Sequence, residues 1–228
     1  MSSVIDTTEM YLRTVYELLE EGVTPLRARI AERMQHSGPT VSQTVSRMER
    51  DGLLTVHGDR RILLSEKGEH LAIQVMRRHR LAERLLVDVI GLSWAEAHEE
   101  ACKWEHVIGE PVEAKLVTLL EDPDVSIYGT PIPRLGESVE ASIRRFLEGV
   151  EVLAYVLQPG EKVSVRLIRI GEFLQRDTET LAALDCAGIT PGVEIQAVCD
   201  PTCLTLLTDT HECCLDADWA EQLFVSRL

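Results

Sequence analysis

A short run of metal-binding side chains near the middle of the chain most restricts what it can fold into. Residues 98–106 contain no Gly, Pro or β-branched residue, so they are predicted to form a helix. At about 100° per residue, His98, Cys102, Glu105 and His106 share one helical face. Imidazole, thiolate and carboxylate are all metal ligands. A fold that closes this face around a cation is favoured over the alternative of a core histidine beside a buried cysteine.

A second pair of ligand-type residues lies upstream. His79 and Glu83 stand four residues apart, which places them on one helical face. Taken alone, this spacing is typical of a solvated ion pair. With residues 98–106 in the same chain, both become candidate ligands.

The totals describe an ordinary globular chain of one large or two to three small domains, with 228 residues and 45% hydrophobic content. No apolar run approaches the ~18 residues that a membrane span needs. The first residues show neither a basic nor an apolar signal region, so a cytoplasmic protein is expected. In that compartment, the six cysteines are predicted to be thiols or metal ligands rather than disulfides.

The formal net charge of −15 at first argues against nucleic acid, but its distribution does not. Between residues 25 and 50, five arginines outnumber two glutamates. From residue 151 onward, thirteen acidic residues outnumber five basic ones. Screening is nearly complete beyond ~10 Å, so a basic N-terminal surface can coexist with an acidic C-terminal third.

The basic segment has the pattern of a helix-turn-helix. Helices are predicted over residues 4–21, with Asp6 as N-cap, over 26–34, and over 40–51 after a break with Gly and Pro. The third helix turns Val41, Val45 and Met48 inward and exposes Ser, Thr, Gln and Arg. Hydroxyls and arginines suit phosphates, and Gln43 suits base edges in the major groove. The alternative is a solvated polar face.

A β-hairpin is predicted directly after these helices, with strands at 53–57 and 62–64 and basic residues at its tip. A hairpin in this position is a wing. Arg60 or Arg61 could reach a phosphate or the minor groove.

The rest of the chain changes from helix to strand. A long apolar helix over 65–90 suits packing against a partner subunit, and helices over 93–106 and 110–120 follow it. Residues 121–136 are predicted to form a Pro-rich linker, and one helix is expected within 138–150. Strands are predicted at 153–157, 163–170, 193–198 and 203–207, with a short helix at 179–187, which favours a small barrel.

Four stretches carry a resemblance to a known family: residues 6–14, 22–33, 37–46 and 79–83. The chain resembles the iron-dependent repressors of the diphtheria toxin repressor family, closely through residues 5–120 and less so beyond 134. The resemblance implies a mainly α fold: a winged helix-turn-helix, a helical dimerisation domain and a C-terminal SH3-like β-barrel. The corresponding ranges are 1–64, 65–136 with the linker from about 121, and 137–228.

The resemblance also implies two metal sites per subunit. The primary site would use Met10, Cys102, Glu105 and His106, and the ancillary site would use His79, Glu83, His98, Glu172 and Gln175. DNA contacts are expected from the exposed residues of the winged helix-turn-helix, namely Arg27, Ser37, Pro39, Thr40, Ser42, Gln43, Arg47, Arg50 and Arg60.

The implied function is an Fe²⁺-activated transcriptional repressor, not an enzyme. It would hold two Fe²⁺ ions per subunit, with Co²⁺, Ni²⁺, Zn²⁺, Mn²⁺ or Cd²⁺ as substitutes in vitro, because sulfur ligands favour softer metals than Mn²⁺. As a homodimer, it would bind palindromic operators of iron-uptake and iron-homeostasis genes, with one or two dimers per operator.

Three alternatives remain. A manganese-responsive regulator of the same fold would favour carboxylates at Met10 and Cys102. A metallohydrolase would use His98-Glu99-x-x-Cys102 in place of the H-E-x-x-H motif, although a thiolate ligand lowers Lewis acidity. A metal-storage protein would bind no specific DNA.

The chain departs from the family pattern in three places. Thr130 replaces an Asn near Arg80 and Ser126, which match an anion site of the family. Arg134 replaces a Gly in the linker. Free thiols in strands, or a small extra zinc site, are the two interpretations of the C-terminal cysteines, namely Cys199, Cys203, Cys213 and Cys214.

Overall fold

The computed structural model describes residues 6–158 and 160–228. It divides into two compact units, each treated by itself below. The first unit comprises Met1–Ala82, Cys102–Asp122 and Pro131–Phe146, and the second comprises Glu83–Ala101, Pro123–Thr130 and Leu147–Leu228. No helix within the described residues has the length and apolar character required to cross a membrane.

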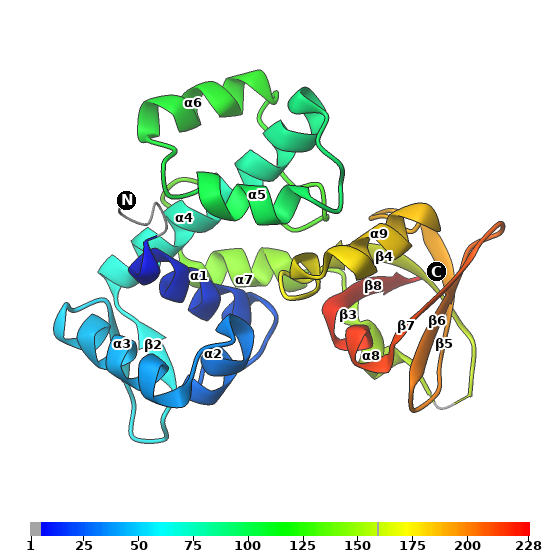
Figure 1. The fold of residues 1–228 in the computed structure, drawn as a ribbon, viewed down its shortest axis with the longest axis horizontal. Coiled ribbons are helices and arrows are strands. Elements are labelled where there is room, and N and C mark those ends of the chain that lie inside the picture. The colour runs from blue at the N-terminus through cyan, green and yellow to red at the C-terminus, as the bar shows by residue number, and fades with distance from the viewer. Residues whose placement is uncertain (1–5, 159) are drawn as a thin grey trace. The chain divides into compact units, whose positions relative to one another are not determined.

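The first unit begins with the predicted winged helix-turn-helix (Figure 1). It contains α1 (Thr7–Glu20), α2 (Arg27–Met34), α3 (Gly38–Arg50) and the hairpin strands β1 (Leu54–Val56) and β2 (Ile62–Leu64). The Asp6 side chain caps α1 by accepting hydrogen bonds from the backbone N–H groups of Thr8 and Glu9. The strands pair antiparallel, with Thr55 opposite Leu63. The expected N-cap and wing are therefore confirmed.

The amphipathic pattern of α3 fixes how this helix is oriented. Val41, Val45 and Met48 are fully buried in a core that also takes side chains from α1, α2 and the hairpin. Ser37 caps the helix by accepting from the backbone N–H of Thr40. The opposite face, which carries Ser, Gln and Arg side chains, is exposed.

The remaining helices are α4 (Glu66–Arg84), α5 (Ala97–Trp104), α6 (Glu110–Leu119) and α7 (Val139–Leu147). The last turns of the long predicted helix are π-helical, η1 (Leu85–Ile90), and the helix stops at Gly91 with a positive φ of 81°. The prediction that α5 continues through residue 106 was wrong. The backbone N–H groups of Val107 and Ile108 both donate to the Trp104 carbonyl, so the chain turns there before Gly109 and Pro111.

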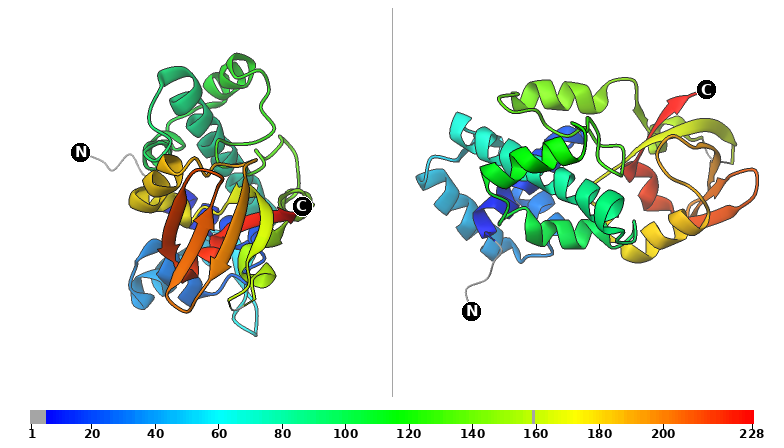
Figure 2. Two further views of the ribbon diagram at one scale, coloured as in Figure 1. Left: turned by 90° about the vertical axis from the view of Figure 1, so that its right-hand side faces the viewer. Right: turned by 90° about the horizontal axis from the view of Figure 1, so that it is seen from above.

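The second unit contains a six-stranded antiparallel sheet in the order β3-β8-β4-β5-β6-β7 (Figure 2). Its strands are β3 (Glu151–Val152), β4 (Val163–Ile170), β5 (Glu194–Cys199), β6 (Cys203–Leu207), β7 (Glu212–Asp216) and β8 (Leu223–Arg227). The helical segments η2 (Leu174–Arg176), α9 (Thr178–Cys186) and η3 (Ala217–Gln222) connect them. Residues of α9, including Leu181 and Leu184, pack into the same apolar core as the strands.

One predicted strand, 153–157, was wrong. Only residues 151 and 152 pair with β8, and the chain then forms a single helical turn, α8 (Leu153–Val156). Leu153 and Val156, three residues apart, are both buried, which is a helical rather than a strand spacing.

The C-terminal cysteines also differ from expectation. Cys203 and Cys214 form a disulfide between β6 and β7, with their Cα atoms 6.1 Å apart. The register explains the pairing, because Cys214 stands opposite Thr205, two residues from Cys203 on the same face. Cys199 and Cys213 are free, as expected. Within the described part of the chain, these cysteines form no group of three or more metal-type ligands, so the extra zinc site is not found.

Candidate metal centre

The first unit brings Cys102, Glu105 and His106 next to α1. Cys102 lies in the last turn of α5, and the other two follow in the turn after Trp104. Arg13 of α1 places its Nη1 atom 2.5 Å from Glu105 Oε2 and 3.3 Å from Cys102 Sγ. Glu9, one turn earlier on α1, accepts a hydrogen bond of 2.6 Å from His106 Nδ1. The predicted primary ligands of the α5 segment thus lie against the N-terminal helix.

Two buried polar atoms of this cluster point to a missing partner. Glu105 Oε1 and His106 Nε2 are 3.4 Å apart. Within the described residues, neither atom has a hydrogen-bond partner. Leaving a buried carboxylate oxygen and a buried imidazole nitrogen unsatisfied is costly, and both are strong ligands for a divalent cation. The residues present therefore fit a metal at this position.

The charges of the cluster also suit a cation. Although burial raises the pKa of Glu105, the positive charge of Arg13 and the hydrogen bond from His79 lower it below its ordinary value, so the carboxylate is ionised. Burial lowers the pKa of His106, but the hydrogen bond to Glu9 and the charge of Glu105 raise it above its ordinary value overall. A metal at His106 must therefore displace a proton more often than at an isolated histidine.

Met10, the fourth predicted primary ligand, is half-buried on α1. It directly follows Glu9 and precedes Arg13 by three residues, and both of these side chains reach the cluster. Its position on the helix is thus compatible with a thioether ligand.

His79 of α4 is also part of the first unit. Its ring is fully buried, and its Nδ1 lies 2.6 Å from Glu105 Oε2. His79 and Cys102 each offer a ligand atom within 4.8 Å of the other. The solvated-pair alternative for His79 and Glu83 is excluded, because both side chains are buried.

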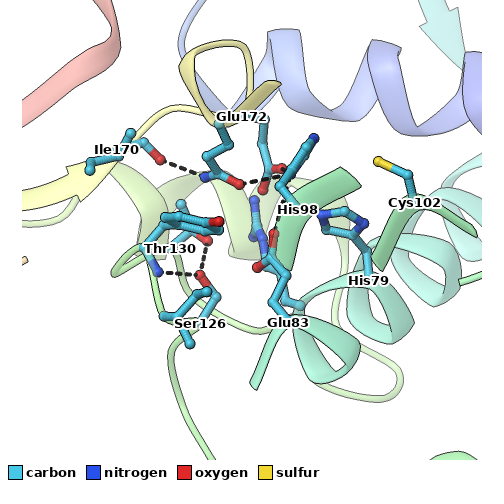
Figure 3. A network of polar contacts seen from close by, with 12 residues as sticks. His79, Glu83, His98, Cys102, Ser126, Thr130, Ile170 and Glu172 are labelled. Carbon is cyan, nitrogen blue, oxygen red and sulfur yellow. Dashed lines mark hydrogen bonds and ion pairs between the residues drawn. The ribbon is translucent and has the colours of Figure 1, made fainter. Parts of the chain in front are cut away.

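The second unit brings together the other predicted ancillary ligands (Figure 3). His98 Nδ1 lies 3.3 Å from Glu83 Oε1, 3.1 Å from Gln175 Oε1 and 3.8 Å from Glu172 Oε2. Ligand atoms of Glu83, His98 and Glu172 all lie within 4.8 Å of one another, and all three residues are buried. Two carboxylates, an imidazole and an amide oxygen form an oxygen-rich donor set.

Residues next to the sheet orient Gln175 and Glu172 toward this set. Gln175 Nε2 donates to the Ile170 carbonyl at 2.8 Å, which turns the amide oxygen toward His98. Gly171, between β4 and Glu172, donates its N–H to the Gln222 carbonyl, and a Cβ there would lie 2.4 Å from Gln222 Oε1. A larger residue at this position would require the Gln222 side chain to move.

The residues matching the family's anion site have partners within their own units. In the first unit, Arg80 is fully buried, forms a double ion pair with Glu20 and donates to the Pro131 carbonyl at 2.6 Å. In the second, the Ser126 and Thr130 hydroxyls are hydrogen-bonded at 2.8 Å (Figure 3). The metallohydrolase alternative loses support too, because Glu99, its proposed general base, is exposed while His98 is buried.

The predicted DNA-contacting residues all belong to the first unit. Arg27 is half-buried at the start of α2, and the other eight are exposed on α3, at its N-terminal end or at the hairpin tip. At the tip, the Asp59 carboxylate accepts from Arg61 Nε at 2.6 Å, whereas Arg60 has a positive φ of 71° and is exposed. Arg60 is thus the better placed of the two for a phosphate.

Sequence reasoning missed four residues around this centre. Glu9 and Arg13 contact predicted ligands from α1, and the Tyr11 hydroxyl is 3.0 Å from Nδ1 of His36, in the turn before α3. The signal was available for Glu9 and Arg13, which stand one residue before and three after Met10. Arg13 stands three residues after Met10 and four after Glu9, a spacing that places helical side chains next to each other.

Three family descriptions match the chain in order. Residues 3–62 match "Iron dependent repressor, N-terminal DNA binding domain". Residues 65–134 match "Iron dependent repressor, metal binding and dimerisation domain", and residues 150–227 match the diphtheria toxin repressor SH3 domain.

Similar proteins are found over nearly the whole length. The chain is 52% identical to the iron-dependent repressor IdeR of Mycobacterium tuberculosis, covering 93% of each chain. It is 50% identical to the diphtheria toxin repressor of Corynebacterium diphtheriae, covering 87% of each. Among solved structures, ScaR with bound Zn²⁺ is 27% identical, with a TM-score of 0.77 over 98% of this chain and 100% of that one.

Proposed function

The chain belongs to the iron-dependent repressor family, and we propose that it represses transcription by binding operator DNA when Fe²⁺ is bound by the two ligand clusters described above. The observation that carries the metal half of this proposal is the buried pair Glu105 Oε1 and His106 Nε2, both without a hydrogen-bond partner within the described residues. The DNA half rests on the exposed polar face of α3.

The first proposed site, named here the sulfur cluster, consists of Met10, Cys102, Glu105 and His106. The second, named the oxygen cluster, consists of Glu83, His98, Glu172 and Gln175, and His79 joins it as the predicted fifth ligand. Bound Fe²⁺ would supply a positive charge that thioether, thiolate, carboxylate and imidazole can share. Two ions per subunit is part of this proposal.

The chain's own residues link the sulfur cluster to the DNA-binding surface. Met10, Glu9 and Arg13 all stand on α1, and Tyr11 on the same helix contacts His36 in the turn before α3. Holding α1 against the α5 segment therefore restrains the turn from which the recognition helix begins. If bound metal and bound DNA both favour the same orientation of α1 and α3, binding of one increases the affinity for the other.

The DNA contacts proposed from the sequence keep their assignments. Ser37, Thr40 and Ser42 suit phosphates, and Gln43 suits base edges. A homodimer would place two α3 helices about 34 Å apart, one turn of DNA, on a palindromic operator. Exposed apolar side chains of the metal-binding and dimerisation segment, such as Val107, Val112 and Leu119, suit a subunit interface. We also propose three domains: a DNA-binding domain at 1–64, a metal-binding and dimerisation domain at 65–136, and a C-terminal domain at 137–228.

Fluorescence anisotropy tests the proposal. A duplex selected from a random pool by the protein with Fe²⁺ is labelled and titrated with full-length protein under anaerobic conditions, with and without the metal. We expect binding that depends on Fe²⁺ and falls steeply with salt. Equal affinity with and without metal would overturn the proposal.

The same assay with Mn²⁺ and Zn²⁺ decides between this function and a manganese-responsive regulator. The two sulfur atoms of the first cluster favour Fe²⁺, Co²⁺, Ni²⁺ or Zn²⁺ over Mn²⁺. Activation at lower Mn²⁺ than Fe²⁺ concentration would favour the alternative.

A further inference from the structure

We infer that Arg13 is an internal cation that competes with the metal for Cys102 and Glu105, and so sets how much metal the repressor needs. The inference rests on the proposed function, because it takes these two residues as ligands of the sulfur cluster. Arg13 itself is not one of the proposed metal ligands.

The guanidinium of Arg13 is surrounded by the atoms that a metal would use. Its Nη1 lies 2.5 Å from Glu105 Oε2, 2.9 Å from His79 Nδ1 and 3.3 Å from Cys102 Sγ, and its Nη2 lies 3.4 Å from the same sulfur. The side chain is 2% exposed, so water screens these contacts little. Oxygen, nitrogen and sulfur donors gathered around one positive group resemble the first shell of a transition metal.

A metal and this guanidinium cannot both have these ligands at full strength. A thiolate sulfur bonded to a metal at ~2.3 Å carries less negative charge, so it accepts the N–H groups of Arg13 more weakly. Two positive charges would also stand within a few ångströms in a buried site, where their repulsion is large. Metal binding is therefore opposed by Arg13 as long as the guanidinium keeps its present contacts.

Glu17 already contacts Arg13 and can keep it paired when its other contacts are lost. Its carboxylate lies one turn along α1, fully buried, with Oε1 2.9 Å from Arg13 Nε. By shifting toward Glu17, the guanidinium can release Cys102 and Glu105 and still be paired. The competition is thus reversible, with Glu17 favouring the metal and Arg13 opposing it.

The two residues therefore predict opposite effects. Arg13→Met removes the competitor, and we expect roughly tenfold or tighter Co²⁺ binding, because a buried Glu105 without Arg13 gains more from a cation. Glu17→Gln removes the negative charge that would keep Arg13 paired away from the ligands, and we expect weaker Co²⁺ binding. A merely structural role would not shift the affinity in opposite directions for two destabilising substitutions.

Co²⁺ titration of full-length protein without oxygen measures this, followed by the absorbance of the cobalt–thiolate bond to Cys102. Thermal melts without metal give the stability of each variant. Arg33→Met is the matched control, because Arg33 is a buried arginine of the same unit that pairs with Glu21. It should lower the melting temperature and leave the Co²⁺ affinity unchanged.

The Co²⁺ affinities of the variants can each contradict the inference. Unchanged or weaker Co²⁺ binding by Arg13→Met overturns the inference. If that variant does not fold, Glu17→Gln decides alone, and unchanged or tighter binding by it overturns the inference. A Cys102→Ser variant that keeps the cobalt–thiolate absorbance would instead contradict the ligand assignment of the proposed function, which is a separate failure.

Discussion

The sulfur cluster and the oxygen cluster both contain imidazole and carboxylate ligands, but only the first contains sulfur, and their surroundings differ. The sulfur cluster combines helix α1 with the end of α5, and its carboxylate is already held by Arg13. The oxygen cluster lies within the second unit, where Glu83 and His98 of the helices meet Glu172 and Gln175, and Gln175 is fixed by the Ile170 carbonyl. One set therefore contacts the helix that supports the DNA-binding surface, and the other contacts a sheet.

This difference separates two tasks. A ligand set on α1 can change the orientation of the helix-turn-helix, so its loading is expected to control DNA binding. A ligand set that includes Glu172 and Gln175 can tie Glu83 and His98 to the sheet of the second unit, and it contains no residue of the DNA-binding helices. The donor atoms are consistent with two separate tasks. Sulfur selects softer metals, whereas carboxylate and amide oxygens select little among divalent ions.

The largest expected effect is the loss of Cys102, which tests whether the sulfur cluster alone controls DNA binding. Cys102→Ala should remove most of the gain in operator affinity that Fe²⁺ gives, about 5–150-fold per site. Anisotropy with the selected operator measures it. Cys186→Ala, which removes an exposed free thiol, is the control and should behave as wild type. Full activation of Cys102→Ala would end the distinction between the clusters.

A smaller effect is expected at the oxygen cluster. His98→Ala removes its central imidazole and should weaken metal binding there roughly tenfold, while operator binding at saturating Fe²⁺ survives. Isothermal titration with Co²⁺ resolves the two sites, and anisotropy reports DNA binding. Complete loss of operator binding would mean that the two tasks are assigned the wrong way round.

A still smaller effect tests the link from α1 to the recognition helix. Tyr11→Phe removes the hydroxyl that contacts His36, a net loss of about 0.5–1.5 kcal/mol. We expect operator affinity to fall ~2–10-fold with no change in Co²⁺ binding. Tyr155→Phe, at an exposed position on α8, is the matched control. A change in metal affinity instead would place Tyr11 with the sulfur cluster.

The last prediction is an absence of effect. Mn²⁺ binding at the oxygen cluster should be the same in Cys102→Ala as in wild type, because that cluster contains no sulfur. Electron paramagnetic resonance of added Mn²⁺ counts the bound ions. A large loss in the variant would show that the two ligand sets load as one.

Local signals in the sequence were enough for much of the fold. The cap at Asp6, the inward face of α3 and the start and end of β4 all depend on neighbouring residues, and all were confirmed. The segment 153–157 was not, because five apolar residues fit a strand and a helical turn equally well. Pairing with β8 decides where the strand ends, and it reaches only residues 151 and 152, through contacts with residues distant in the sequence.

The candidate site divides in the same way. Ligand types and spacing predicted that Cys102, Glu105 and His106 belong together, although the last two lie beyond the end of α5. Arg13 could not be found from spacing within 98–106, because its contacts span about ninety residues of sequence. The disulfide of Cys203 and Cys214 was missed because it depends on strand register, which the sequence leaves open.

The two carboxylate oxygens of Glu105 face different partners. Oε2 lies next to Arg13 and His79, and Oε1 lies next to His106. Both oxygens belong to one rigid plane, so a pull on either edge rotates the other about a single torsion angle. Movement of His79 is thereby transmitted to the far side of the group as a twist of one bond. The Glu105 carboxylate thus connects the imidazoles of His79 and His106 through one side chain.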